Sequence, residues 1–325
     1  MFEENPNQRI WINEVAPRDG FQIESQIIPT ALKVDLINRL SKTGVSKIEV
    51  TSFVSPKAIP ALADADEVMA AINRPTGVGM VALVPNARGA ERALACNVDE
   101  MNLVMSVSET HNLANLRMTH QQSFEQLNQV SSAAKGSKTE LNLSLSCAFG
   151  CPMEGTQSAD DVMHWVEMAL GIGITSITLC DTTGMAWPTQ VHSLCKRFIQ
   201  TFPEVPLTAH FHNTRSMGLT NVLAAISAGV RVFDASLGGL GGCPYAPGAS
   251  GNVCTEDMVH MLELMGYNTG VDLRDLIQCA ALLPGLVGHD VPGQVLKAGH
   301  ALDLHPIPAY VKTAREHALG RSTSS

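Results

Sequence analysis

The sequence lacks the features that mark several large classes of protein. It has no apolar run of about 18 residues, the length that a membrane-spanning helix needs. Residues 1–7 are polar and acidic, unlike a signal or transit peptide. Basic residues are scarce, because 22 lysines and arginines stand against 31 acidic residues and the formal net charge is -9. We therefore expect a cytoplasmic protein with no membrane or nucleic-acid partner, since both partners require a basic surface.

Paired cysteines, phosphate-binding motifs and linkers are also missing. The eight cysteines are scattered without a CxxC pair, which argues against a zinc ribbon and against a disulfide framework. There is no GxxxxGK[ST] sequence, and no GxGxxG follows an expected strand. No low-complexity segment divides the 325 residues, of which 45% are hydrophobic, so we predict one domain with one large core.

Short β-rich segments alternate with helical segments along the chain, which is typical of parallel strands joined by helices. The eight expected strands are Ile10–Ala16, Lys47–Phe53, Gly79–Val84, Glu100–Val107, Leu141–Ala148, Ser176–Cys180, Leu207–Phe211 and Val232–Leu237. They predict an α/β fold, a (β/α)8 TIM barrel over about residues 8–270, with a C-terminal helical cap over about 271–325. A doubly wound open sheet is the alternative, because sequence does not exclude a sheet edge.

Ionisable residues gather at the carboxyl ends of these strands, where the active sites of such barrels lie. Arg18 and Asp19 close the first strand, Glu49 lies in the second, and His210 and His212 close the seventh. Residues two apart on a strand point to the same face, so both imidazoles can reach one cation. Asp19 offers the oxygen ligand that magnesium or manganese prefers. The alternatives are a structural role for the two histidines and a helix cap for Asp19.

A glycine-rich run, residues 238–242, precedes Cys243. Because glycines let backbone and substrate approach closely, Cys243 can serve as a proton donor. An inert loop thiol is the alternative, since thiol reactivity depends on the local pKa. Asn252 comes just before an expected helix over Thr255–Leu264, where a helix cap is the common role and a carbonyl ligand the rarer one.

Four segments make the chain similar to the 3-hydroxy-3-methylglutaryl-CoA (HMG-CoA) lyases, a family of metal-dependent TIM-barrel enzymes. They are VAPRDGFQ at 15–22, IEVTSFVSP at 48–56, CPMEG at 151–155, and the run over 238–257. The resemblance extends from about Glu14 to Leu273. The last segment is the most specific, because its GLGGCPYA core looks like the signature that holds the family's catalytic cysteine and that related synthases lack.

The resemblance implies a reaction and a role for each site residue. The reaction would be cleavage of HMG-CoA to acetyl-CoA and acetoacetate by a homodimer in leucine degradation, with Mg²⁺ or Mn²⁺ as cofactor. The implied cation ligands are Asp19, His210, His212 and Asn252, with Glu49 supporting them. Asp19 would also take the hydroxyl proton, Arg18 would stabilise the acyl-CoA enolate, and Cys243 would reprotonate carbon. The expected substrate contacts are Arg18, Gln22, Ser52, Asp181, Thr182 and Met153.

Three positions depart from the family pattern. Phe21 stands where leucine is usual, Met153 where tyrosine is usual, and Asn213 where aspartate usually follows the second histidine. Because methionine lacks the phenol donor, the accepted acyl group can differ. The alternative substrates are citramalyl-CoA, giving pyruvate and acetyl-CoA, and a longer-chain 3-hydroxyglutaryl-CoA. A Claisen-type synthase, against which Cys243 argues, and a non-catalytic acyl-CoA-binding protein are the rival functions.

Overall fold

The central feature of the fold is a closed barrel of parallel strands. The computed structural model describes residues 7–242 and 251–319. Around the barrel the strand order is β1, β10, β9, β8, β5, β4, β3, β2. Their bounds are β1 Trp11–Glu14, β2 Lys47–Ser52, β3 Gly79–Leu83, β4 Glu100–Ser106, β5 Glu140–Ser146, β8 Ser176–Asp181, β9 Leu207–Phe211 and β10 Val232–Ala235. All eight expected strands are present, and closure between β1 and β10 confirms the TIM barrel and excludes the open sheet.

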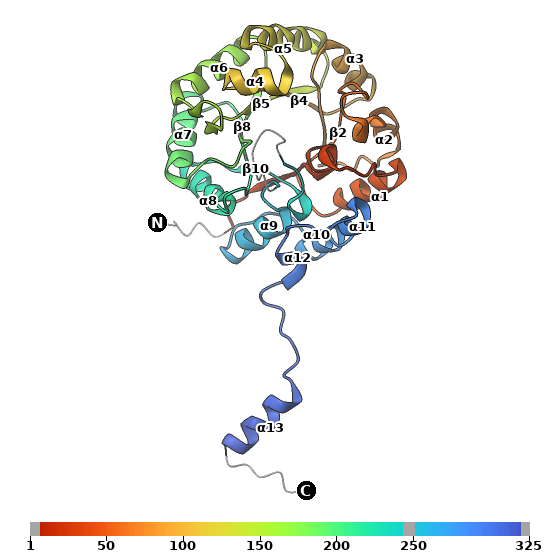
Figure 1. The fold of residues 1–325 in the computed structure, drawn as a ribbon, viewed down its shortest axis with the longest axis vertical. Coiled ribbons are helices and arrows are strands. Elements are labelled where there is room, and N and C mark those ends of the chain that lie inside the picture. Colours follow the sequence, from red (N-terminus) through yellow and green to blue (C-terminus); the bar gives the residue numbers. More distant parts are fainter. Residues whose placement is uncertain (1–6, 243–250, 320–325) are drawn as a thin grey trace.

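Helices form an outer ring around the strands (Figure 1). They are α1 Thr30–Leu40, α2 Ala65–Ala71, α3 Ala87–Ala95, α4 Glu109–Leu116, α5 His120–Ala134, α6 Ala159–Gly171, α7 Pro188–Thr201, α8 Gly218–Ala228 and α9 Thr255–Leu264. Thr119 begins α5 with a capping box to Gln122, and the Ser158 hydroxyl caps α6. Among the described helices, none combines the length and apolar character that crossing a membrane requires.

Two local features differ from the expected elements. The first strand ends at Glu14 because residues Ala16–Gly20 form a π-helical turn, a rare conformation that is frequent at functional sites. A short hairpin of β6 (Gly150–Cys151) and β7 (Gly155–Thr156) follows β5. Both lie beyond the carboxyl ends of strands, so both shape the mouth of the barrel.

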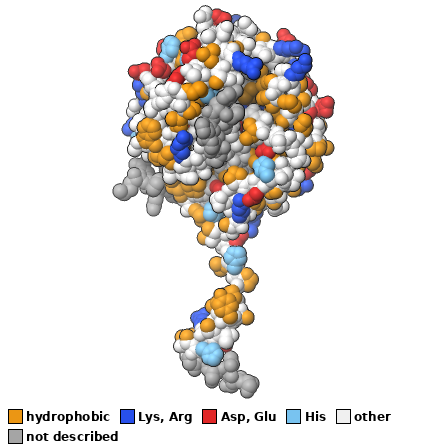
Figure 2. All heavy atoms as spheres, viewed as in Figure 1, with side chains coloured by type: hydrophobic (Ala, Val, Ile, Leu, Met, Phe, Trp, Pro, Cys, Tyr) orange, Lys and Arg blue, Asp and Glu red, His pale blue; other side chains and the backbone are white. Residues whose placement is uncertain are grey.

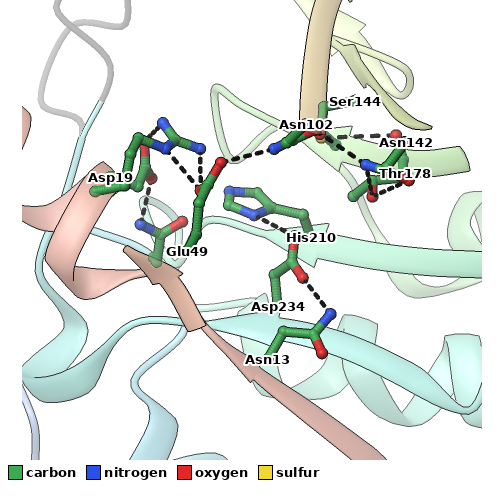
Figure 3. Close-up of polar contacts among 12 residues, drawn as sticks. Asn13, Asp19, Glu49, Asn102, Asn142, Ser144, Thr178, His210 and Asp234 are labelled. Carbon is green, nitrogen blue, oxygen red and sulfur yellow. Dashed lines mark hydrogen bonds and ion pairs between the residues drawn. The ribbon is translucent and has the colours of Figure 1, made fainter. Parts of the chain in front are cut away.

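The barrel interior carries a chain of polar side chains (Figure 3). The Asn142 amide donates to Asn102 Oδ1 and to Thr178 Oγ1, each at 3.0 Å, and the Ser144 hydroxyl donates to Asn102 Oδ1 at 2.8 Å. Asn102 in turn donates to Glu49 Oε1 at 2.9 Å. Buried polar groups need such hydrogen-bond partners. This series of hydrogen bonds ends at Glu49, a residue of the expected site.

Beyond α9 the chain first packs on the barrel and then leaves it. Helices α10 (Leu273–Ala280), α11 (Leu283–Val287) and α12 (Val295–Ala298) bury apolar side chains beside α1, α9 and the turn after β10. Residues 301–319 are instead exposed throughout, including α13 (Ala309–Ala318). Figure 1 shows α13 apart from the barrel, at the end of an extended segment.

Candidate metal centre and active site

Three side chains converge at the carboxyl ends of β1 and β9. Asp19 lies in the π-helical turn after β1, His210 lies in β9, and His212 follows that strand. One ligand atom from each of the three lies within 4.8 Å of the other two, and all three residues are buried. The two imidazole centroids are 5.3 Å apart. The structure therefore brings together three of the four predicted ligands around a volume that one cation can fill.

Asn252, the fourth predicted ligand, lies in contact with this group. Its backbone forms an antiparallel bridge with His212, and its Nδ2 donates to Asp19 Oδ2 at 2.7 Å. Its Oδ1 is buried and has no hydrogen-bond partner among the described residues. Because α9 begins at Thr255 with Cys254 at its N-cap, Asn252 does not cap that helix. A buried carbonyl oxygen beside a carboxylate and two imidazoles suits a divalent cation, so these residues fit one.

Arg18 forms two buried ion pairs, one with Asp19 and one with Glu49. Its Nη1 lies 2.6 Å from Asp19 Oδ1, and its Nε and Nη2 each lie 2.6 Å from Glu49 Oε2. A guanidinium has five N–H donors, so two remain beyond the three in these contacts. Burial opposes the charge, but Glu49 and Asp19 raise the pKa of Arg18 above its ordinary value. Within the described part of the chain, Arg18 is thus a fixed cation that Glu49 holds and that keeps two N–H donors to spare.

Asp19 is ionised because of its neighbours. Burial alone raises its pKa, but the charges of Arg18, His210 and His212 and the hydrogen bond from Asn252 bring the pKa below the usual value. Ionisation suits a cation ligand, whereas the low pKa makes Asp19 a weaker proton acceptor. Asp19 caps no helix, so this alternative from the sequence is wrong.

The other predicted contacts differ in their access to the mouth. The Gln22 amide donates to Asp19 Oδ1 at 2.8 Å, which places Gln22 beside the ligands. Met153, in the β6–β7 turn, is 48% exposed. Thr182 is partly exposed, and its hydroxyl accepts from the Cys147 amide at 3.1 Å. The Ser52 hydroxyl is buried and accepts from the Val54 amide at 3.2 Å.

Asp181 has a strong structural role at the end of β8. Its Oδ1 accepts from the backbone amides of Met185 and Ala186 at 2.8 and 3.0 Å. Its Oδ2 is buried without a hydrogen-bond partner in the described part of the chain. Burial raises the pKa of Asp181 to about 6 despite those two hydrogen bonds. Asp181 therefore shapes the loop after β8 and keeps one oxygen for another donor.

Two of the three departures from the family pattern have a structural explanation. Phe21 is 1% exposed and belongs to the core. Asn213 Oδ1 accepts from the Gly218 amide at 3.0 Å, at the start of α8. Neither change removes one of the four predicted ligands.

Cys243 lies outside the described residues, which stop at 242 and resume at 251. On one side, Gly241 has a φ of 108°, and a Cβ there would lie 2.4 Å from Asn252 Nδ2 and 3.3 Å from Asp19 Oδ2. Only glycine tolerates this φ and this approach without strain. On the other side the described chain resumes at Gly251, next to Asn252. The described residues that flank Cys243 therefore lie against the predicted ligands.

Asp234 in β10 is a site residue that the sequence interpretation missed. Its Oδ2 lies 3.3 Å from His210 Nδ1, and its Oδ1 accepts from Asn13 Nδ2 at 2.9 Å. A carboxylate on one imidazole nitrogen fixes the ring and leaves the other nitrogen for a cation. Burial lowers the pKa of His210, but Asp234 raises it above the usual value. The sequence did contain a signal for Asp234, namely an acidic residue inside an otherwise apolar strand.

Replacing Asp234 with alanine is expected to weaken Mn²⁺ binding about 10–100-fold, because His210 loses the group that orients it. Isothermal titration calorimetry measures this affinity. Asn13→Ala is the matched control, since it removes the other contact of Asp234 and leaves His210 untouched. An Asp234→Ala protein with wild-type Mn²⁺ affinity would show that Asp234 does not position the ligand.

Glu14, also missed, joins three segments of the site. Its Oε1 accepts from the Ala16 and Leu237 amides at 2.8 Å, and its Oε2 accepts from the Thr255 hydroxyl at 2.7 Å. It thereby links the turn that carries Arg18 to the glycine-rich run and to α9. Burial raises the pKa of Glu14 from 4.5 to about 7, although the three hydrogen bonds oppose the change.

The raised pKa predicts that Glu14 destabilises the fold at alkaline pH. Its protonated form is favoured in the folded state, so its stabilising contribution is complete below pH 4.5 and is lost as the pH rises through about 7. Glutamine keeps the two backbone contacts and can donate to Thr255. The free energy of unfolding of Glu14→Gln should therefore exceed that of the wild type by about 3 kcal/mol at pH 8 and by much less at pH 5. Urea unfolding at both pH values checks this, and a pH-independent difference would contradict it.

Comparisons with known proteins show the family to which the chain belongs. The HMGL-like family profile matches residues 9–283. Hydroxymethylglutaryl-CoA lyase YngG of Bacillus subtilis is 43% identical over 89% of this chain and 97% of that protein. (R)-Citramalyl-CoA lyase of Chloroflexus aurantiacus is 39% identical over 90% of this chain and 95% of that protein. An HMG-CoA lyase of Acinetobacter baumannii, solved in complex with coenzyme A and 3-methylmalate, is 53% identical with a TM-score of 0.89, over 92% of this chain and 98% of that one. By sequence and by fold, the chain belongs to the HMGL-like family.

Proposed function

We propose that the protein is a carbon–carbon lyase that cleaves HMG-CoA to acetyl-CoA and acetoacetate with a divalent cation. The observation that carries the proposal is the convergence of Asp19, His210 and His212, with ligand atoms within 4.8 Å of one another, beside the buried guanidinium of Arg18. The similarity to the HMG-CoA lyases of B. subtilis and A. baumannii supports the choice of substrate.

The residues that would hold Mg²⁺ or Mn²⁺ are Asp19, His210, His212 and Asn252. Such a cation, when bound, supplies a Lewis acid for the hydroxyl and carboxylate oxygens of the substrate. Glu49 supports this group indirectly, because it holds Arg18, which in turn pairs with Asp19. The ionised Asp19 and the spare N–H donors of Arg18 thus lie side by side.

The chain's own residues can then carry the protons and the charge. Asp19 accepts the proton of the substrate's tertiary hydroxyl, and the adjacent carbon–carbon bond breaks as that oxygen becomes the ketone of acetoacetate. The bond's electron pair passes to acetyl-CoA as its enolate, whose charge the spare N–H donors of Arg18 stabilise. Cys243 returns a proton to the enolate carbon, which completes acetyl-CoA.

Acyl-CoA would be bound by Gln22, Ser52, Asp181, Thr182 and Met153 together with Arg18. A bound coenzyme A in the A. baumannii relative supports an acyl-CoA partner. The seven described cysteines are free thiols, which suits a reducing compartment such as the cytoplasm. The family resemblance supports a homodimer.

Citramalyl-CoA is the second candidate substrate. The 39% identity to the (R)-citramalyl-CoA lyase of C. aurantiacus favours it, as does Met153, which is 48% exposed where the family usually has tyrosine. The same site residues would act, and pyruvate would replace acetoacetate as the ketone product.

Mass spectrometry of the products tests the proposal. The purified protein is offered HMG-CoA and citramalyl-CoA separately with Mg²⁺ or Mn²⁺, with a chelator as the control. Acetoacetate and acetyl-CoA from HMG-CoA, at the higher kcat/KM and abolished by chelation, would support it. A higher kcat/KM for citramalyl-CoA would change the substrate and keep the chemistry, whereas cleavage of neither would reject both substrates.

A further inference from the structure

The loop between β8 and α7, residues 182–187, lies at the mouth of the barrel, and we call it the β8 loop. Two of its backbone carbonyls, those of Thr183 and Gly184, accept from Nη1 of Arg215 at 3.2 and 2.9 Å. Both residues are buried, so their carbonyl oxygens need hydrogen-bond partners. Arg215 itself is exposed and lies between β9 and α8. An arginine at the surface thus supplies hydrogen bonds to the buried backbone of a neighbouring loop.

The segment between β9 and α8 packs closely against the β8 loop. Gly184 has a φ of 58°, and a Cβ there would lie 2.6 Å from Thr214 Cβ. No side chain fits at this position without moving the two loops apart. Asn221, buried in α8, adds a further contact, because its Nδ2 donates to the carbonyl of Ala186 at 3.1 Å. Arg215 and Asn221 therefore hold the β8 loop at three carbonyls from the side of β9.

The β8 loop in turn orients Asp181, an expected substrate contact at the end of β8. Asp181 Oδ1 accepts from the amides of Met185 and Ala186 in this loop. A shift of the loop would break these hydrogen bonds and free Oδ2 from its fixed direction, where it is buried without a partner in the described part of the chain. The guanidinium of Arg215 is also close enough to act by charge, because it is one of the groups that oppose the rise of the Asp181 pKa caused by burial.

On its other side the β8 loop contacts the segment that leads to the β6–β7 hairpin. The Thr183 hydroxyl donates to the carbonyl of Gly150 at 3.3 Å, and the Thr182 hydroxyl accepts from the Cys147 amide at 3.1 Å. Met153, the residue expected to influence which acyl group is accepted, lies in the turn of this hairpin. The β8 loop therefore joins two groups of expected substrate contacts, and its position affects both.

We propose that Arg215 is a positioning residue of the acyl-CoA site, which holds the β8 loop so that Asp181 and Thr182 face the substrate. The proposal rests on the proposed function, because it takes these two residues as acyl-CoA contacts. Arg215 is none of the proposed cation ligands, so its loss should weaken substrate binding and leave the cation site intact. Among the described residues on the face drawn in Figure 2, lysine and arginine side chains lie in separate groups. This distribution favours a local role for an exposed arginine over a share in a broad anion-binding surface.

Three full-length variants test the proposal. Arg215→Met removes the donors but keeps an unbranched side chain, and Arg215→Lys keeps a cation with donors that can reach a carbonyl. Arg74→Met is the matched control. Arg74 is also exposed and donates to a backbone carbonyl, that of Cys96, at 2.6 Å, but it lies near the amino ends of β3 and β4, away from the mouth.

Steady-state kinetics with HMG-CoA separates substrate binding from turnover. We expect Arg215→Met to raise KM about tenfold and to change kcat far less, because it weakens binding of the substrate and of the transition state alike. Arg215→Lys should restore most of the wild-type KM, and Arg74→Met should keep it. The affinity for Mn²⁺, measured by calorimetry, should equal the wild-type value in all three variants.

Hydrogen exchange followed by mass spectrometry gives a second readout, which needs no turnover. Asp181 accepts from the Met185 and Ala186 amides, so these amides are protected while the loop holds its position. Peptides that cover the β8 loop should therefore exchange faster in Arg215→Met than in the wild type, with the rest of the barrel unchanged.

Wild-type exchange in this loop, a fall in kcat at unchanged KM, equal effects of Arg215→Met and Arg74→Met, or a loss of Mn²⁺ affinity would each overturn the proposal. If the wild type cleaves no HMG-CoA, the proposed lyase reaction fails, whereas the exchange data still show whether Arg215 positions the loop.

Discussion

Replacing Cys243 with alanine is expected to lower turnover of HMG-CoA about 10²–10⁴-fold, the range for the loss of one general acid. Affinity for Mn²⁺ should stay at the wild-type value, because the four proposed ligands are untouched. The described residues that flank Cys243 support a role at the site, since Gly241 approaches both Asp19 and Asn252. Steady-state kinetics and calorimetry on the same preparation measure the two quantities separately.

His210→Ala is the comparison variant for Cys243→Ala, because it should lower Mn²⁺ affinity as well as turnover. It removes a proposed ligand whose ligand atom lies within 4.8 Å of those of Asp19 and His212, so Mn²⁺ affinity should fall together with turnover. Equal loss of Mn²⁺ affinity in both variants would refute the separate role of Cys243. A Cys243→Ser protein with full activity would favour the Claisen-type synthase instead.

The parts of the fold and site that could be predicted are those that depend on patterns among residues close together in the sequence. The eight strands of the barrel were found because each is a short apolar segment followed by helical sequence. His210 and His212 were assigned to one face because residues two apart on a strand share it. Their meeting with Asp19 followed from the rule that parallel strands of a barrel present their carboxyl ends to the same mouth.

The missed residues depend on contacts that local patterns do not encode. Glu14 binds the Leu237 amide 223 positions away, and Asn13 binds Asp234 across 221 positions. Both contacts exist because β1 pairs with β10 when the barrel closes. The early end of β1 has a local cause instead, since Glu14 holds the π-helical turn that follows it through the Ala16 amide. Asn252 likewise does not cap a helix as expected, because its side-chain amide donates to Asp19 Oδ2.

Arg18→Gln is expected to cost both stability and activity. Arg18 is 8% exposed and Glu49 is 3% exposed, so removing the guanidinium leaves an uncompensated charge in the interior. Breaking such a pair costs about 3–5 kcal/mol. Turnover should fall about 10²–10³-fold, as for the loss of one group that stabilises a developing oxyanion. Urea unfolding and steady-state kinetics measure the two losses.

The double variant Arg18→Gln with Glu49→Gln separates these two effects. It removes the stranded carboxylate, while the glutamine introduced in its place can still accept from the Asn102 amide, so most of the lost stability should return. Turnover should stay low, because no guanidinium faces the enolate. Recovery of turnover together with stability would mean that Arg18 acts only by holding the fold, and its proposed part in the reaction would be wrong.

The pH dependence of Arg18→Gln offers an independent check of the same argument. Burial raises the pKa of Glu49 even with Arg18 and Asn102 opposing it, and loss of Arg18 should raise that pKa further. A folded pKa above the unfolded value favours the protonated carboxyl, so stability present at low pH is lost as the pH rises through the folded pKa. The stability deficit of Arg18→Gln should therefore be smaller at pH 5 than at pH 8. In the double variant the part of this pH dependence that comes from Glu49 should vanish, because the introduced glutamine has no proton to lose, and only the smaller part from Asp19 should remain. An undiminished pH dependence in the double variant would show that Glu49 is not the titrating group.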